Sequence, residues 1–128
     1  MKFTSFNPSI ITSHSDDIIR LFESLGFERR HMKTGIESST GEKNINANRM
    51  KHPSGFYVDV TQVDSMERDM MTIRMNVDNF EEAREFLAAR GFQNVNQKTG
   101  VTETPSSRAT MMVSPSGFSI SITEHIKE

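Results

Sequence analysis

The chain of 128 residues contains no cysteine. A disulfide framework and thiol chemistry are therefore both excluded. No run of apolar residues approaches the length that crosses a membrane, and the first residues lack the pattern of a signal peptide. These absences favour a cytoplasmic protein that does not act at a membrane.

The sequence also lacks an excess of basic charge. It has 15 Lys and Arg against 17 Asp and Glu, with both signs mixed along the chain. Proteins that bind nucleic acid usually gather basic residues in a patch or stripe, so nucleic acid is excluded as a partner. Hydrophobic residues make up only 34% of the chain, which is low for a globular domain. A thin, curved sheet with a polar inner face would explain this fraction, and so would a large share of solvated loop.

What the sequence does contain is an internal repeat. Three short motifs occur twice in the same order, about 62 to 65 residues apart. They are Gly-Phe at 26–27 and 91–92, Lys-Thr-Gly-Ile/Val at 33–36 and 98–101, and Pro-Ser-Gly-Phe at 53–56 and 115–118. A fixed internal period indicates one supersecondary unit that is used twice.

The same secondary structure is predicted around the motifs of each half. Residues 15–24 have apolar side chains at helical spacing, with Ser15 or Asp16 as the candidate N-cap. A matching helix follows Asn79, and Gly26 and Gly91 are suited to end the two helices. A strand-like run precedes each helix, and an alternating strand follows each Pro-Ser-Gly turn. The unit is therefore β-α-β-β-β.

Length sets how these units are organised. Residues 1–63 form the first module, 64–69 a polar connector and 70–128 the second module. Each module of about 60 residues would have a marginal core alone, so both should pack into a single domain. The fold class is α+β.

Two such modules, with these motifs, resemble the glyoxalase / bleomycin-resistance / extradiol-dioxygenase superfamily, also called the vicinal oxygen chelate fold. The similarity covers essentially the whole chain and includes the first helix ending at 24–27 and the final turn and strand at 114–120. It implies two tandem βαβββ modules that form a cupped mixed sheet around a cavity, with the helices on the outside.

Metal-dependent members of that family hold a divalent cation with His and Glu from the first and last strand of each module. Carried over to this sequence, those positions fall near Pro8 and at Asp59, Thr72 and Ser121. Only Asp59 has a side chain that Zn, Ni or Fe prefers. The resemblance therefore implies the fold and the cavity without a metal or other cofactor, and it argues against metal-dependent glyoxalase or dioxygenase activity.

Alternation along the strands predicts which side chains line the cavity. The inward set is polar, and the residues expected to bind a ligand are Tyr57, Asp59, Thr72, Arg74 and Ser121. Asp59 and Arg74 either pair with each other or recognise a polar ligand. The polar face can equally be the solvated side of an antiparallel sheet. The register of Met112 stays open, so this side chain either faces the cavity or packs in the core.

Three functions fit these observations. The first is a binding protein that holds a small organic molecule in a metal-free cavity, as drug-sequestering members of the family do. The second is a metal-dependent lyase or dioxygenase with a displaced metal site, built from Asp59 and His52 with Glu124 or His125. The third is an effector-sensing or interaction module. The resemblance also implies a homodimer, which is the commonest oligomer in general.

Overall fold

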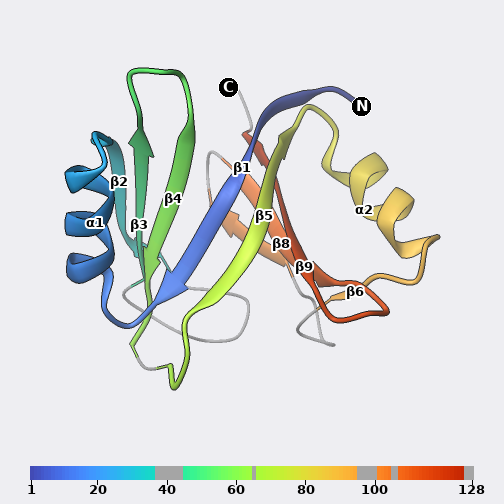
Figure 1. Ribbon diagram of the computed structural model, residues 1–128. Coiled ribbons are helices and arrows are strands. Elements are labelled where there is room, and N and C mark those ends of the chain that lie inside the picture. The colour runs from blue at the N-terminus through green and yellow to red at the C-terminus, as the bar shows by residue number, and fades with distance from the viewer. Residues whose placement is uncertain (37–44, 65, 95–100, 105–106, 126–128) are drawn as a thin grey trace. The chain divides into compact units, whose positions relative to one another are not determined.

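The computed structural model describes residues 1–36, 45–64, 66–94, 101–104 and 107–125, and it is of the α+β class. The elements follow in the order β1 (Phe3–Thr12), α1 (Ser15–Ser24), β2 (Glu28–Ile36), β3 (Ile45–Lys51), β4 (Tyr57–Gln62), β5 (Met70–Val77), α2 (Phe80–Ala88), β6 (Gln93–Asn94), β7 (Val101–Thr104), β8 (Ser107–Val113) and β9 (Ser119–His125) (Figure 1). The first half has the predicted β-α-β-β-β order. In the second copy, two short strands, β6 and β7, follow the helix where the first copy has β2 alone.

The chain divides into two compact units. The first unit is Asn7–Met71, and the second unit joins Met1–Phe6 to Thr72–Glu128. β1 therefore contributes residues to both units. Neither α1 nor α2 is long and apolar enough to cross a membrane, and no other described segment is such a helix.

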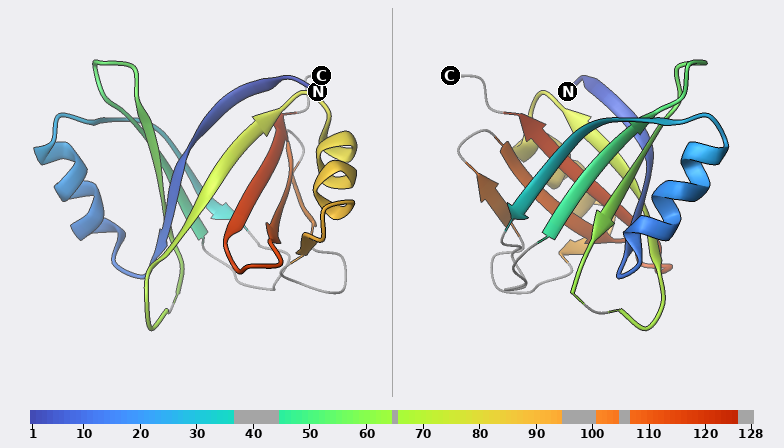
Figure 2. Two further views of the ribbon diagram at one scale, coloured as in Figure 1. Left: turned by 45° about the vertical axis from the view of Figure 1, so that its right-hand side comes forward. Right: turned by 90° about the vertical axis from the view of Figure 1, so that its left-hand side faces the viewer.

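In the first unit the strand order is β2-β3-β4-β1. β3 runs antiparallel to both of its neighbours, whereas β1 is parallel to β4 with Ser9 opposite Asp59, so the pairing is mixed as predicted. α1 lies along one face of these strands (Figure 2, right). The core beneath it consists of buried side chains from the helix, β3 and β4, namely Ile19, Met50, Val58 and Val60.

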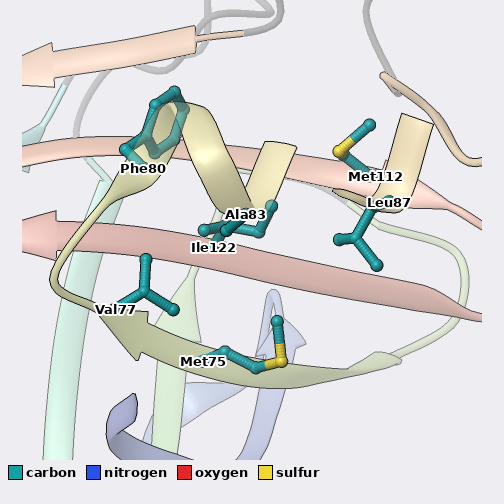
Figure 3. Packing of buried hydrophobic residues seen from close by; sticks show 7 residues of the cluster. All are labelled: Met75, Val77, Phe80, Ala83, Leu87, Met112 and Ile122. Atoms are coloured by element: carbon teal, nitrogen blue, oxygen red, sulfur yellow. The ribbon is translucent and has the colours of Figure 1, made fainter. Parts of the chain in front are cut away.

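The second unit repeats this plan with the order β5-β9-β8-β6, and β7 also pairs with β8. β5 is parallel to β9, with Arg74 opposite Ser121, and β8 is antiparallel to β9. α2 packs on one face of the strands (Figure 2, left). Figure 3 shows the core between helix and strands, which consists of Met75, Val77, Phe80, Ala83, Leu87, Met112 and Ile122.

Both helices end in the same way. The amide of Gly26 donates to the carbonyl of Glu23 and the amide of Phe27 to that of Phe22, and Gly26 has a φ of 101°. This is the Schellman arrangement, in which glycine supplies the left-handed residue. Gly91, with a φ of 90°, and the residue after it repeat both hydrogen bonds at the end of α2. Both Gly-Phe motifs therefore form the C-terminal cap of a helix.

The Pro-Ser-Gly-Phe motifs form matching tight turns. In the first turn the amide of His52 donates to the carbonyl of Phe56 at 2.8 Å, and in the second Ser114 donates to Phe118 at the same distance. The glycine of each turn has a positive φ, 97° at Gly55 and 108° at Gly117. These turns explain why the motif recurs, because only glycine adopts this backbone without strain.

The sequence predicted the N-cap of α2 correctly but not that of α1. Asn79 is the N-cap of α2 as expected, and its side chain accepts a hydrogen bond from the Glu82 amide at 3.1 Å. For α1 the prediction of Ser15 or Asp16 as N-cap was wrong. His14 occupies that position without a side-chain cap, and the Ser15 amide donates to Gln62 Oε1 at 2.8 Å. A partner from β4 therefore replaces the local cap.

Candidate functional site

The predicted alternation on β4 is confirmed. Val58 and Val60 are buried in the core under α1. Tyr57, Asp59 and Thr61 alternate with them and so project from the opposite face of the strand. Asp59 is nevertheless only 1% exposed, so this polar face is not simply a solvated sheet surface at that position.

β5 and β9 follow the same pattern in the second unit. Met75, Val77 and Ile122 pack under α2, which leaves Thr72 and Ser121 on the face away from the helix. The Ser121 hydroxyl lies 3.3 Å from that of Thr72 and donates to it. These two predicted site residues are therefore brought together.

Asp59 lies at the centre of a cluster in the first unit, made of Asn7, Arg49, Tyr57 and Asp59 and called the Asp59 cluster below. Asn7 Nδ2 donates to Asp59 Oδ2 at 2.7 Å, a buried hydrogen bond between β1 and β4. Arg49 Nη1, from β3, lies 3.5 Å from Asp59 Oδ1. The carboxylate is thus held by an amide on one side and a guanidinium on the other.

Tyr57 supports the cationic side of the Asp59 cluster. The guanidinium carbon of Arg49 lies 4.3 Å from the centre of the Tyr57 ring. The Lys51 ammonium lies 5.4 Å from the same ring. Both distances are within the range at which a cation is attracted by an aromatic face.

In the second unit, Arg74 lies beside the Thr72–Ser121 pair. Its Nε donates to Asn76 Oδ1 at 3.1 Å, and its backbone is opposite Ser121 in the β5–β9 ladder. Thr72 and Asn76 are both buried. We call Thr72, Arg74, Asn76 and Ser121 the Thr72 cluster. The expectation that Asp59 and Arg74 either pair with each other or recognise a polar ligand stays a prediction.

Two members of the Asp59 cluster, Asn7 and Arg49, were missed by the sequence analysis. The carried-over position was placed near Pro8, and the neighbouring Asn7 is the residue that is buried against Asp59, whereas Pro8 itself is exposed. The sequence contained a signal for Asn7, because polar and apolar residues alternate along β1. Pro8 and Ile10 belong to the apolar set, and Asn7 and Ser9 belong to the polar set. No such signal marked Arg49, because Ile45 and Ala47 share its face of β3 and Asn46 and Asn48 share the face of Met50.

The open register of Met112 is settled by the structure. Met112 is 2% exposed and packs under α2 with Leu87 and Ile122 (Figure 3). Its neighbour Met111, opposite Ser121 in the ladder, is on the other face. Met112 is therefore a core residue.

The donor set does not fit a transition metal. Asn7, Thr72 and Ser121 offer amide and hydroxyl oxygens, which Zn, Ni and Fe do not prefer. The one carboxylate, Asp59, is already paired with Arg49. Over the part of the chain that the structure describes, no group of three or more His, Cys, Asp and Glu side chains could hold a metal ion.

The residues suggested for a displaced metal site have other contacts. His52 Nδ1 accepts a hydrogen bond from the Ser54 amide at 3.0 Å, and its ring stands edge-on to Phe27. Glu124 accepts one from the Phe80 amide at 3.2 Å, at the start of α2. Both side chains therefore have structural roles in a turn and at a helix start.

Solved structures of low sequence identity have the same fold. A glyoxalase I mutant from Zea mays superposes with a TM-score of 0.63 at 12% identity, over 98% of this chain and 44% of that one. A Staphylococcus aureus protein gives a TM-score of 0.64 at 11% identity, covering 97% of this chain and 98% of the other. A Vibrio splendidus member of the glyoxalase/bleomycin resistance protein/dioxygenase superfamily gives 0.52 at 13% identity, over 98% and 100%.

The chain thus spans less than half the length of the maize enzyme and the full length of the Vibrio protein. No protein-family model matches the sequence, and no curated protein matches it either. At these identities the likeness shows the fold alone.

Proposed function

We propose that this chain, which has the vicinal oxygen chelate fold, binds a small organic molecule in a cavity lined by its polar sheet faces, without a metal ion. The observation that carries this proposal is the Asp59 cluster. A carboxylate that is 1% exposed and held by Asn7 and Arg49 is costly to build, and a sheet face that only met solvent would not need it. Buried, ordered polar groups of this kind are typical of sites that orient a ligand.

Five residues have proposed roles in that site. Asp59 accepts hydrogen bonds from the ligand, and Tyr57 offers its ring and hydroxyl. Thr72 and Ser121 supply neutral hydroxyl groups, and Arg74 supplies a fork of donors. The close hydroxyl pair and the ordered Arg74 side chain support this assignment.

Binding is favoured over metal-dependent catalysis by the chemistry of the donors. A divalent cation beside Asp59 would be repelled by the Arg49 guanidinium, and the amide and hydroxyl groups nearby would compensate little. We therefore derive no metal-dependent step.

The first experiment is a metal determination with thermal unfolding, on protein purified without a chelator. We expect no metal to copurify in stoichiometric amount and none of Ni, Zn, Mn or Fe(II) to raise the melting temperature. One metal per chain with a clear stabilisation would contradict the proposal.

The second experiment is a thermal-shift screen of small polar organic molecules. A ligand that binds only the native state raises the melting temperature, by an amount that grows with its concentration. The shift should be lost in Asp59→Asn and reduced in Thr72→Val, and it should persist in the control Asp69→Asn, at an exposed carboxylate. The absence of any shift across a broad panel would count against the proposed function.

We further propose that the protein is a homodimer. Sedimentation velocity at micromolar concentration should then give twice the chain mass of 14.5 kDa. A single species at the monomer mass would refute this.

A further inference from the structure

The guanidinium of Arg49 has few hydrogen-bond partners for its degree of burial. Its side chain is 21% exposed, yet its one hydrogen bond or ion pair within the described residues is the long 3.5 Å contact with Asp59. A guanidinium carries five N–H donors, so most of them point to no acceptor in the described part of the protein. None of its nitrogen atoms is among the fully buried side-chain atoms that lack a partner in the described residues, so the remaining donors are accessible to a ligand.

Lys51 adds a second cation on the same face. Arg49 and Lys51 are two residues apart on β3, and both lie near the ring of Tyr57. In the β3–β4 ladder their backbones are opposite Asp59 and Tyr57. Arg49 and Lys51 thus place two cationic groups around one aromatic ring beside Asp59.

From this geometry we infer that Arg49 and Lys51 bind the anionic group, carboxylate or phosphonate, of a small organic ligand. This deepens the proposed function and rests on it. A guanidinium fork matches the two oxygens of either group, and the ammonium adds a point charge. Both cations lie near the Tyr57 ring, and Asp59, itself held by Asn7, contacts the guanidinium.

The arrangement also explains why Asp59 does not neutralise the site. Asn7 donates to Asp59 at 2.7 Å, a much shorter contact than the 3.5 Å between Asp59 and Arg49. The carboxylate therefore orients the guanidinium while most of the donors stay available. A ligand anion beside Arg49 would accept hydrogen bonds from these N–H donors.

The test uses the full chain, with the Nε–Hε resonances of arginine followed by NMR and the Arg49 signal assigned with Arg49→Gln. Benzoate and phenylphosphonate are titrated at constant ionic strength, with benzamide as the neutral analogue of benzoate. We expect saturable shifts of the Arg49 signal by at least one anion at about 1 mM or below, and none with benzamide.

Variants distinguish binding by the charges of Arg49 and Lys51 from a nonspecific effect of removing any positive charge. Arg49→Gln should weaken binding of the anion about tenfold or more, and Lys51→Gln by a smaller factor. Arg68→Gln removes an exposed arginine and is the matched control, with binding unchanged. A folded Arg49→Gln protein that binds the anion as tightly as the parent would overturn the inference.

Other outcomes distinguish this inference from the proposed function. Equal binding of benzamide and benzoate would overturn the anionic class and leave a small-molecule site. The same shifts with chloride or inorganic phosphate would mean an adventitious ion only and would also overturn it. If neither anion moves the Arg49 signal while the broad screen finds a neutral ligand, the inference fails and the proposed function stands.

Discussion

At the scale of single residues, the protein is most unusual at Asp59. Its neighbours on β4 are the buried valines of the first core, and Asp59 is as inaccessible as they are. It is tolerated because Asn7 and Arg49 provide hydrogen bonds and charge. The three side chains come from three different strands, so each depends on the others to remain satisfied.

Replacing Asp59 with Ala should therefore destabilise the fold. The change removes the acceptor that the Asn7 amide and the Arg49 guanidinium share, and we expect a loss of about 2–4 kcal/mol in the free energy of unfolding. Urea denaturation followed by circular dichroism measures it. Asp69→Ala, at an exposed position, should stay within about 0.5 kcal/mol of the parent. Equal stability of the two variants would mean that the Asp59 cluster contributes nothing to folding.

Met111 and Met112 offer a second comparison between neighbouring residues. Met112→Ala opens a cavity in the core under α2 and should cost about 2–4 kcal/mol. Met111→Ala, on the opposite and half-buried face, should cost less than half as much. Chemical denaturation of both variants tests this. A larger loss for Met111 would reverse the assignment of faces.

At the scale of elements, the repeat joins each helix end to the turn before the last strand of its module. An added Cβ on Gly26 would lie 3.0 Å from His52 Nε2, and one on Gly91 would lie 2.8 Å from Pro115 Cγ. His52 and Pro115 belong to the corresponding Pro-Ser-Gly turns. Glycine at the helix end is therefore needed both for its positive φ and for the close approach of the turn.

The glycines of the second module allow these two effects to be separated. In Gly117→Ala only the backbone is strained, because nothing lies within 4 Å of an added Cβ, and we expect a loss of about 1–2 kcal/mol. Gly91→Ala has a similar φ and a clash with Pro115, and should lose about 1–2 kcal/mol more. Thermal and urea unfolding compare the two. Equal losses would show that the turn moves aside at no cost.

At the scale of the whole molecule, the units do not follow the order of the chain. Met1–Phe6 groups with Thr72–Glu128. The Lys2 amide donates to Asp78 Oδ1 at 2.6 Å, and the Asp78 amide donates back to the Lys2 carbonyl at 3.1 Å. The first residues of the chain are thus tied to the start of α2.

Removing residues 1–6 should therefore destabilise the second unit. Three hydrogen bonds at the start of α2 are lost, two with Asp78 and one from the terminal amine of Met1 to Glu82, and we expect a decrease of about 1–3 kcal/mol in unfolding free energy. Hydrogen exchange should become faster in α2 and β5, and Thr4→Ala, an exposed change in the same segment, should leave it unaltered. Unchanged protection of α2 in the truncated chain would refute this.

The sequence alone determined the α+β class, the positions of both helices and the faces of β4, β5 and β9. These features depend on local physics, since glycine ends a helix, Asn79 caps one and a period of two separates the faces of a strand. Only the tertiary structure decided which polar side chains surround Asp59. Asn7 and Arg49 meet it through the registers of β1 and β3 on β4, which depend on strand pairing between residues far apart in the chain.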